Sequence, residues 1–185
     1  MVGGGGASLD GQSRYFSISG IIQWMTMAFQ GDINDAALIM YSVLRRLGSG
    51  EVDTFAKRLH SQKAQYIAQI FAISPVYNFN LYIRGPYSPD LARDLFELKR
   101  QRITPKIEKF TPSELEERFQ KAKGFMAGKT VRQLELVVTL HWLIDVARLS
   151  PDVARTKLKA IKTVDDEQSE VIYESVQQLC QLSRK

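Results

Sequence analysis

The 185-residue sequence has little of the chemistry on which most enzymes depend. Its single cysteine, Cys180, excludes an intrachain disulfide and a four-cysteine zinc site. Of its two histidines, His60 has no carboxylate at metal-binding spacing, and His141 lies in an apolar segment with Asp145 four residues later. No Walker A, dinucleotide-binding, serine-hydrolase or zinc-protease motif occurs. We therefore expect a protein that is not an enzyme, that binds no cofactor or metal, and that keeps His141 as a satisfied core residue.

Long apolar runs are also missing. Residues 18–29 are apolar, but polar side chains interrupt them and the run is too short to cross a bilayer. Residues 1–13 lack the basic and apolar parts of a signal peptide, and their four consecutive glycines indicate a flexible tail, either native or added. Because Cys180 lies among apolar residues, we expect it to be a buried, unoxidised thiol. These features favour a soluble cytoplasmic protein that makes no contact with a membrane.

The composition is that of one folded domain. Hydrophobic residues make up 44% and charged residues 24% of the chain, which is enough to fill a core and cover a surface. We expect residues 14–185 to form a single domain, with helices and a small ribbon in 14–110 and a helical extension in 111–185. The formal charge of +5 permits binding to nucleic acid or to an acidic protein but requires neither.

Hydrophobic periodicity predicts a mainly α (α+β) fold. Apolar residues recur at helical spacing in 36–47, 52–73, 89–100, 111–126 and 130–148, and two more helices follow at 150–161 and 165–182. The segment 130–148 is apolar nearly all round, which indicates a central helix. Alternating apolar residues in 77–83 and 102–110 predict two short strands. Together they suggest a winged-helix-like helical core with a two-stranded antiparallel ribbon and a C-terminal helical part.

The turn at residues 84–89 has the sequence Arg-Gly-Pro-Tyr-Ser-Pro. Glycine and proline allow a tight reversal, and Ser88 followed by Pro89 is a typical helix start. Two interpretations of the turn fit the sequence. Arg84 beside the free N–H groups of the helix could hold an anion, with Tyr82 and Tyr87 stacking on a ligand. In the other, Arg84 pairs with Asp90 or Asp94, and Tyr87 fills the junction between elements.

Several residues around this turn carry a resemblance to a known family. The pattern is Gln62-Lys63-x-x-Tyr66, then Phe79-x-Leu81-Tyr82 and Gly85-Pro86-Tyr87-Ser88, with Leu134-Glu135 and Thr139-Leu140 further on. It resembles the YwgA-like family and the broader Panacea (SocA-like, phage-associated protein) domain, over about residues 36–110. The resemblance implies an antitoxin-like or regulatory protein that acts through protein–protein contact. It supplies no catalytic residue.

Two sets of candidate contact residues follow. For a protein partner, we expect a surface formed by Arg84, Tyr82, Tyr87, Gln62, Lys63 and Tyr66. The alternative is a winged-helix nucleic-acid-binding protein, because residues 99–132 are rich in lysine and arginine. Its phosphate contacts would be Arg100, Arg102, Lys106 and Lys109, on a wing around Pro105. A homodimer through Trp24, Met25, Met27 and Phe29 is a further prediction.

Overall fold

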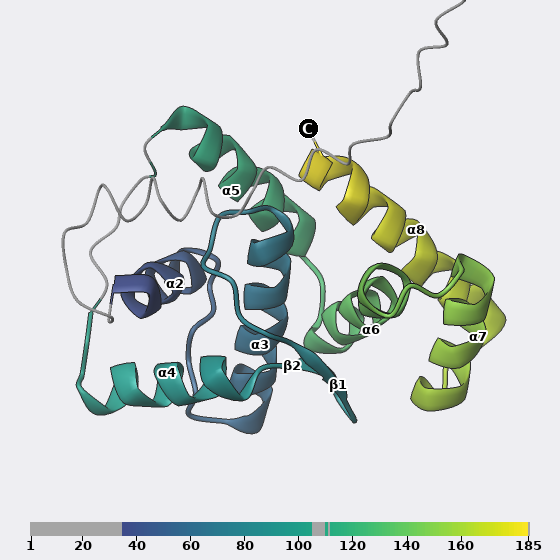
Figure 1. The fold of residues 1–185 in the computed structure, drawn as a ribbon, viewed down its shortest axis with the longest axis horizontal. Helices are drawn as coiled ribbons and strands as arrows, with labels where there is room; N and C mark the ends of the chain where they lie inside the picture. Colours follow the sequence, from purple (N-terminus) through teal and green to yellow (C-terminus); the bar gives the residue numbers. More distant parts are fainter. Residues whose placement is uncertain (1–34, 105–109, 111, 185) are drawn as a thin grey trace, which may run out of the picture. The chain divides into compact units, whose positions relative to one another are not determined.

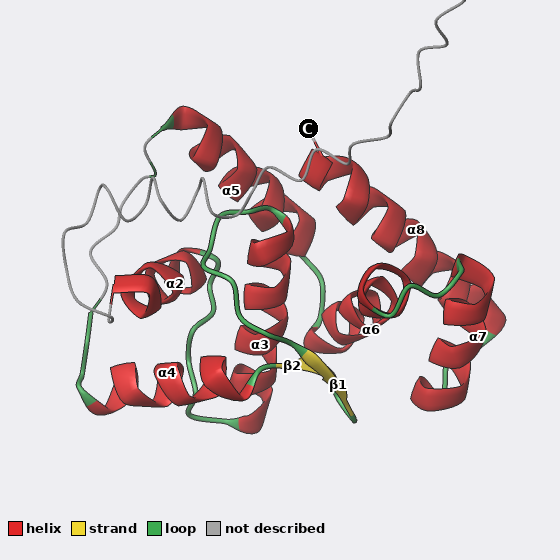
Figure 2. Ribbon diagram, viewed as in Figure 1, coloured by secondary structure: helices red, strands yellow, loops and turns green. Residues whose placement is uncertain are grey.

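The structure is a computed structural model that describes residues 35–104, 110 and 112–184. This part of the chain is mainly helical and contains one two-stranded antiparallel ribbon, as expected (Figures 1 and 2). In chain order the elements are α2 (Asp35–Arg46), α3 (Phe55–Ile70), β1 (Asn80–Tyr82), β2 (Gly85–Tyr87), α4 (Pro89–Arg100), α5 (Ser113–Met126), α6 (Val131–His141), the π-helical turn η1 (Trp142–Val146), α7 (Pro151–Lys162) and α8 (Asp166–Arg184).

Local capping interactions explain where several helices begin. The Ser88 hydroxyl accepts a hydrogen bond from the Leu91 backbone N–H at the start of α4. Pro89 suits the first position of this helix, because proline has no N–H that would need an acceptor there. Thr54 caps α3 in the same way, and Thr130 forms a reciprocal capping box with Gln133 at the start of α6. The helices expected within the described residues are therefore confirmed, with ends that move by a few residues.

Helix α6 lies at the centre of the core. Its side chains Leu134, Val138 and Leu140 are fully buried, and it contacts α3, α7, α8 and β2. Figure 1 shows it between α3 and α8. The helix widens into η1 at Trp142, whose indole N–H donates to the Phe79 carbonyl oxygen at 3.2 Å. The expectation of a central helix at this place is confirmed.

The ribbon is formed by the turn itself. Tyr82 pairs with Gly85 and Asn80 with Tyr87, so a two-residue turn joins β1 to β2. The second strand that we expected in 102–110 is wrong for its described residues, which are not in a strand. Instead Arg102 adopts a left-handed conformation with φ of 55°, and the Ile103 N–H bonds back to the Leu98 carbonyl, which ends α4. Residues 105–109 lie outside the described part.

Three glutamines on one face of α3 explain why the expected strand at 77–83 begins only at Asn80. Gln69 accepts a hydrogen bond from the Tyr77 N–H at 3.0 Å and donates to the Tyr77 carbonyl at 3.1 Å. Gln62 does the same for Ser88, at 2.8 and 3.0 Å, and Gln65 donates to the Pro75 carbonyl. We call Gln62, Gln65 and Gln69 the glutamine ladder. Their side-chain amides occupy the extended backbone groups that a neighbouring strand would otherwise bind.

Candidate binding cleft at the hairpin

The hairpin turn is held from the core side by two lysines and a helix. The Lys63 ammonium donates to the Pro86 carbonyl at 2.6 Å, and the Lys162 ammonium of α7 donates to the Ile83 carbonyl. Gly85 has φ of +78° and sits directly on α6, where an added Cβ would lie 2.4 Å from the Thr139 hydroxyl oxygen. The turn is therefore fixed in place and requires glycine at this position.

A buried charge cluster lies beneath the turn. Glu135 is almost fully buried and accepts hydrogen bonds from Lys162 at 2.6 Å and from Arg132 at 2.9 Å. Lys63 is fully buried and has no carboxylate within 4 Å among the described residues. Burial lowers the pKa of the Lys63 amine to about 7, the charge of Glu135 opposes this shift, and Lys162 adds to it. Even when the Lys63 amine is neutral, the two cations Lys162 and Arg132 outnumber the carboxylate of Glu135 under the hairpin.

In front of this cluster lies a cleft of about 420 Å³ between the first half of α3, the hairpin and α4. We call it the hairpin cleft. It is lined by Val52, Phe55, Arg58, Leu59, Gln62, Lys63, Tyr82, Ile83, Arg84, Gly85, Tyr87, Ala92, Leu95 and Phe96.

The hairpin cleft gathers large apolar side chains that remain open to solvent. Phe55 is 58% exposed, Tyr82 51%, Ile83 90% and Phe96 49%. The Tyr82 ring also makes an edge contact with the Tyr87 ring at a centroid distance of 5.4 Å. Full burial of one such side chain is worth about 1.5–3 kcal/mol. A contiguous exposed apolar surface of this kind is typical of an interaction site.

The charges that line the hairpin cleft are all positive. They belong to Arg58, Lys63 and Arg84, and none of the aspartates and glutamates in the described part of the chain lines the cleft. The Arg58 guanidinium donates to the Val52 carbonyl at 3.1 Å, which leaves most of its N–H groups free for another acceptor. Arg84 is exposed and forms no ion pair with any described residue.

The expected pairing of Arg84 with Asp90 or Asp94 is therefore wrong. Asp90 pairs instead with Arg93 at 2.9 Å, and Asp94 accepts a hydrogen bond from the Tyr77 hydroxyl at 2.9 Å. The start of α4 does not serve as an open anion site either, because the buried Ser88 side chain caps it. An anion at this place would meet the side chains of Arg84 and Arg58.

The structure brings five of the six expected interaction residues to the hairpin cleft. Tyr82, Arg84 and Tyr87 line it from the hairpin, whereas Gln62 and Lys63 are buried in its wall and bind backbone groups.

The sixth, Tyr66, is a core residue. Its hydroxyl lies 3.0 Å from His141 Nδ1, and its ring makes an edge contact with Phe79. It is buried because it points from α3 towards α6, away from solvent. Burial also lowers the pKa of His141, so this histidine is a neutral core residue, as expected.

Sequence reasoning missed several residues of the site. Phe96 is one of them: Leu91, Leu95 and Leu98 form the buried stripe of α4, and Phe96 lies beside this stripe, about 100° around the helix from Leu95. That angular offset could have revealed its exposure. The contacts of Lys162 and Glu135 with the turn join segments far apart in the chain, and no local pattern indicates them.

The expected nucleic-acid contacts do not form one described surface. Arg100 pairs with Glu97 at 2.6 Å, and Lys99 pairs with Asp53. Arg102 is exposed at the end of α4. Lys106 and Lys109 lie outside the described residues, as do the expected tail at 1–13 and the proposed dimer cluster of Trp24, Met25, Met27 and Phe29.

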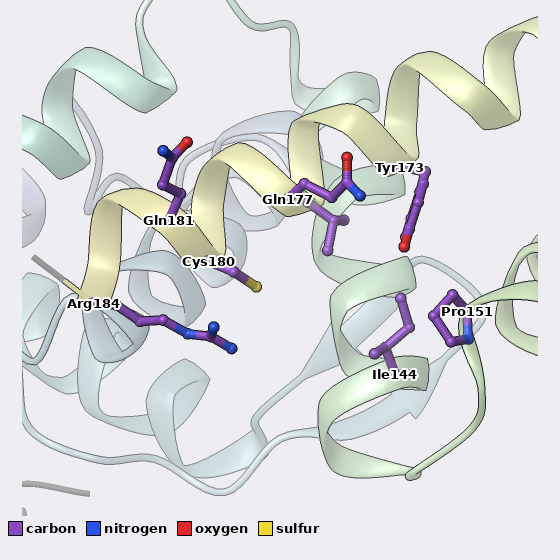
Figure 3. Close-up of a pocket in the computed structure, with 8 residues that line it drawn as sticks. Ile144, Pro151, Tyr173, Gln177, Cys180, Gln181 and Arg184 are labelled. Atoms are coloured by element: carbon purple, nitrogen blue, oxygen red, sulfur yellow. The ribbon is translucent and has the colours of Figure 1, made fainter. Parts of the chain in front are cut away.

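A second hollow of about 600 Å³ lies between η1, α7 and α8 (Figure 3). Ile144, Pro151 and Tyr173 point towards its interior, and the partly buried Cys180 lies along its wall. Burial raises the pKa of the Cys180 thiol, so this cysteine is a poor nucleophile. Among the residues that the structure describes, Arg184 is the one charged side chain that lines the hollow. The one aromatic side chain described in the lining of this hollow, Tyr173, is partly buried, whereas the aromatic residues Phe55, Tyr82 and Phe96 of the hairpin cleft are exposed.

Comparisons with known proteins were made for the whole chain. No protein family, no curated protein and no solved structure matches it.

Within residues 35–104, 110 and 112–184, no helix is both long and apolar enough to cross a membrane. The same residues contain no cluster of three or more side chains that could hold a metal ion. The function must therefore be argued from the site itself.

Proposed function

We propose that this chain is a non-enzymatic interaction protein, antitoxin-like or regulatory, that binds a protein partner in the hairpin cleft. One observation carries the proposal: Phe55, Tyr82, Ile83 and Phe96 are exposed around a single cleft whose charged lining residues are all cationic. Solvent-exposed aromatic residues next to arginines are typical of the parts of an interface that contribute most to affinity. The antitoxin-like part of the proposal rests on the sequence resemblance to the Panacea domain alone.

The support for the proposal includes the rigidity of the site. The glutamine ladder, Lys63 and Lys162 hold the hairpin backbone, and Gly85 sits against α6. A surface that is already ordered in the free protein loses little conformational entropy on binding. The cleft therefore suits recognition of a partner without rearrangement of the hairpin.

The nucleic-acid alternative has weaker support. A nucleic acid carries one charge per nucleotide and needs a row of cations along its backbone. Among the described residues, Arg58 and Arg84 supply only two accessible cations at the cleft. The acidic residues Asp53 and Glu97 directly follow the lining residues Val52 and Phe96 in the chain. Arg100 and Lys99 are paired with Glu97 and Asp53.

Site-specific photo-crosslinking in cells tests the proposal. A benzoylphenylalanine replaces Phe96 in one variant and Val171 in a control, since Val171 is an exposed apolar residue of α8 outside the cleft. We expect a defined protein to be crosslinked from position 96 and not from position 171. If the function is antitoxin-like, that protein expressed alone arrests growth and co-expression of the chain relieves the arrest. Crosslinks from both positions to the same proteins, or to nucleic acid alone, would contradict the proposal.

A further inference from the structure

The hairpin cleft combines exposed apolar side chains with two arginines, Arg58 and Arg84, that pair with no carboxylate of the described residues. We infer that it binds an acidic, apolar peptide segment of the partner, with apolar side chains between Phe55 and Phe96 and a carboxylate on Arg58 and Arg84. This inference rests on the proposed function and adds the chemistry of the segment that is recognised.

The first argument is charge complementarity. Arg84 forms no ion pair with a described residue, and Arg58 uses its side chain on a backbone carbonyl. The adjacent exposed cations differ, because Lys57, Arg93, Lys99 and Arg100 all pair with nearby carboxylates. The two arginines of the cleft are thus the ones left for an external acceptor, and arginine binds a carboxylate through two parallel hydrogen bonds.

The second argument is the buried charge behind the turn. The Lys162 ammonium binds the Ile83 carbonyl oxygen and the Lys63 side chain binds the Pro86 carbonyl oxygen, on either side of Arg84 and Gly85. Glu135 pairs with Lys162 and Arg132, so one carboxylate faces two cations even when the Lys63 amine is neutral. The positive charge in a poorly solvated wall favours an anion in the cleft and opposes a cationic peptide.

The third argument is size and lining. A volume of about 420 Å³ lies within the range of about 300–1,000 Å³ that holds a small ligand or a few side chains. Leu59, Ala92 and Leu95, which are less exposed than Phe55 and Phe96, add further apolar lining to the cleft. Apolar side chains of a peptide would be buried against this lining, whereas a phosphate backbone would gain nothing from it.

The test is a selection of random twelve-residue peptides displayed on phage. The baits are the wild-type chain, Phe96→Asp, the double variant Arg58→Gln with Arg84→Gln, and a control double variant, Arg93→Gln with Arg148→Gln, which changes two exposed arginines that do not line the cleft. Melting curves confirm that all baits are folded. The dissociation constant of the most enriched peptide is then compared with that of the same peptide carrying Gln in place of each Glu and Asp.

We expect the wild-type and control baits to enrich peptides that are rich in Leu, Phe or Trp and carry an excess of Asp and Glu. The amide version of the best peptide should bind at least tenfold more weakly to the wild type. It should bind the Arg58/Arg84 variant within about twofold of the acidic peptide.

The two ways of failing are distinguishable. If enrichment depends on Phe96 but the peptides carry no acidic excess, or their amide versions bind equally well, the carboxylate inference is overturned and the proposed function stands. If no enrichment depends on Phe96, both are overturned. Tighter binding of a single-stranded 20-nucleotide DNA probe than of any selected peptide, lost in the Arg58/Arg84 variant, would replace the peptide by nucleic acid.

Discussion

Gly85 is the residue at which the hairpin backbone touches the central helix. Its φ of +78° and the 2.4 Å approach of an added Cβ to the Thr139 hydroxyl make two separate demands for glycine. Gly128 has a similar φ of +73°, but nothing lies within 4 Å of an added Cβ. Comparing substitutions at Gly85 and Gly128 therefore separates the cost of backbone strain from the cost of a steric clash.

We predict that Gly85→Ala lowers the free energy of unfolding by about 3 kcal/mol, against about 1 kcal/mol for Gly128→Ala, because only the first adds a clash to the strain. Adding Thr139→Ala to the Gly85 variant should recover a large part of the loss, since it removes the nearest oxygen. Urea unfolding measures the free energy of unfolding of the wild type and of each of these variants. Equal costs at the two glycines would show that the contact with α6 does not constrain the turn.

The lowered pKa of Lys63 predicts how the free energy of unfolding depends on pH. The folded pKa of about 7 lies below the ordinary value of 10.5, so between these pH values the unfolded chain holds a proton on this amine that the folded chain lacks. The stability therefore rises with pH in this window, with a slope that approaches about 1.4 kcal/mol per pH unit. Below pH 7 both states are protonated and the contribution to the slope vanishes.

We expect the variant Lys63→Met to lose this rise, whatever its absolute stability. Unfolding free energies at pH 6, 7, 8 and 9 for wild type and variant test it, because burial keeps the tyrosines Tyr66 and Tyr77 protonated well above this range. Parallel curves for the two proteins would mean that Lys63 is charged in the folded state at all of these pH values.

At the scale of elements, the glutamine ladder lets one helix support an extended segment as a strand would. Gln62, Gln65 and Gln69 follow at steps of three and four, which places them on one face of α3. Each binds backbone of residues 75–88 through its side-chain amide. This arrangement fixes the hairpin next to α3 and thereby forms one wall of the cleft.

Gln62→Leu should therefore cost about 1–3 kcal/mol in the free energy of unfolding, because it leaves the N–H of buried Ser88 without a partner, whereas the Ser88 carbonyl keeps the Ala92 N–H. Gln178→Leu, at an exposed position of α8, is the matched control and should change stability by less than about 0.5 kcal/mol. Thermal unfolding followed by circular dichroism compares the stability of the two variants with that of the wild type. A similar shift for both variants would argue against the ladder.

Most elements were predictable because their signals are local. Apolar spacing located α2 to α8, and Ser88-Pro89 located the start of α4. The second strand was misplaced because alternation around Pro105 resembles an edge strand, whereas β2 consists of Gly85–Tyr87, a segment that reads as a turn. The site was partly predictable: the turn drew attention to Arg84, Tyr82 and Tyr87. Phe55, Arg58 and Phe96 join them only through the packing of α3 against the hairpin and α4.

At the scale of the whole described part, the core and the cleft share one scaffold. Helix α6 supports the hairpin from behind through Thr139 and Glu135, and α7 reaches the same turn through Lys162. The same hairpin lines the cleft, together with the exposed aromatic residues Phe55 of α3 and Phe96 of α4. Binding in the cleft would therefore act on a turn that is tied to the centre of the fold.

The most direct test of the cleft as the binding site is the affinity of the crosslinked partner for two purified variants. Phe96→Asp places a charge in the apolar and acid-free cleft, whereas Val171→Asp makes the same change on exposed α8. We predict by isothermal titration calorimetry that Phe96→Asp weakens binding at least tenfold and that Val171→Asp changes it by less than about twofold. Equal affinities for the two variants, with both folded, would contradict the account.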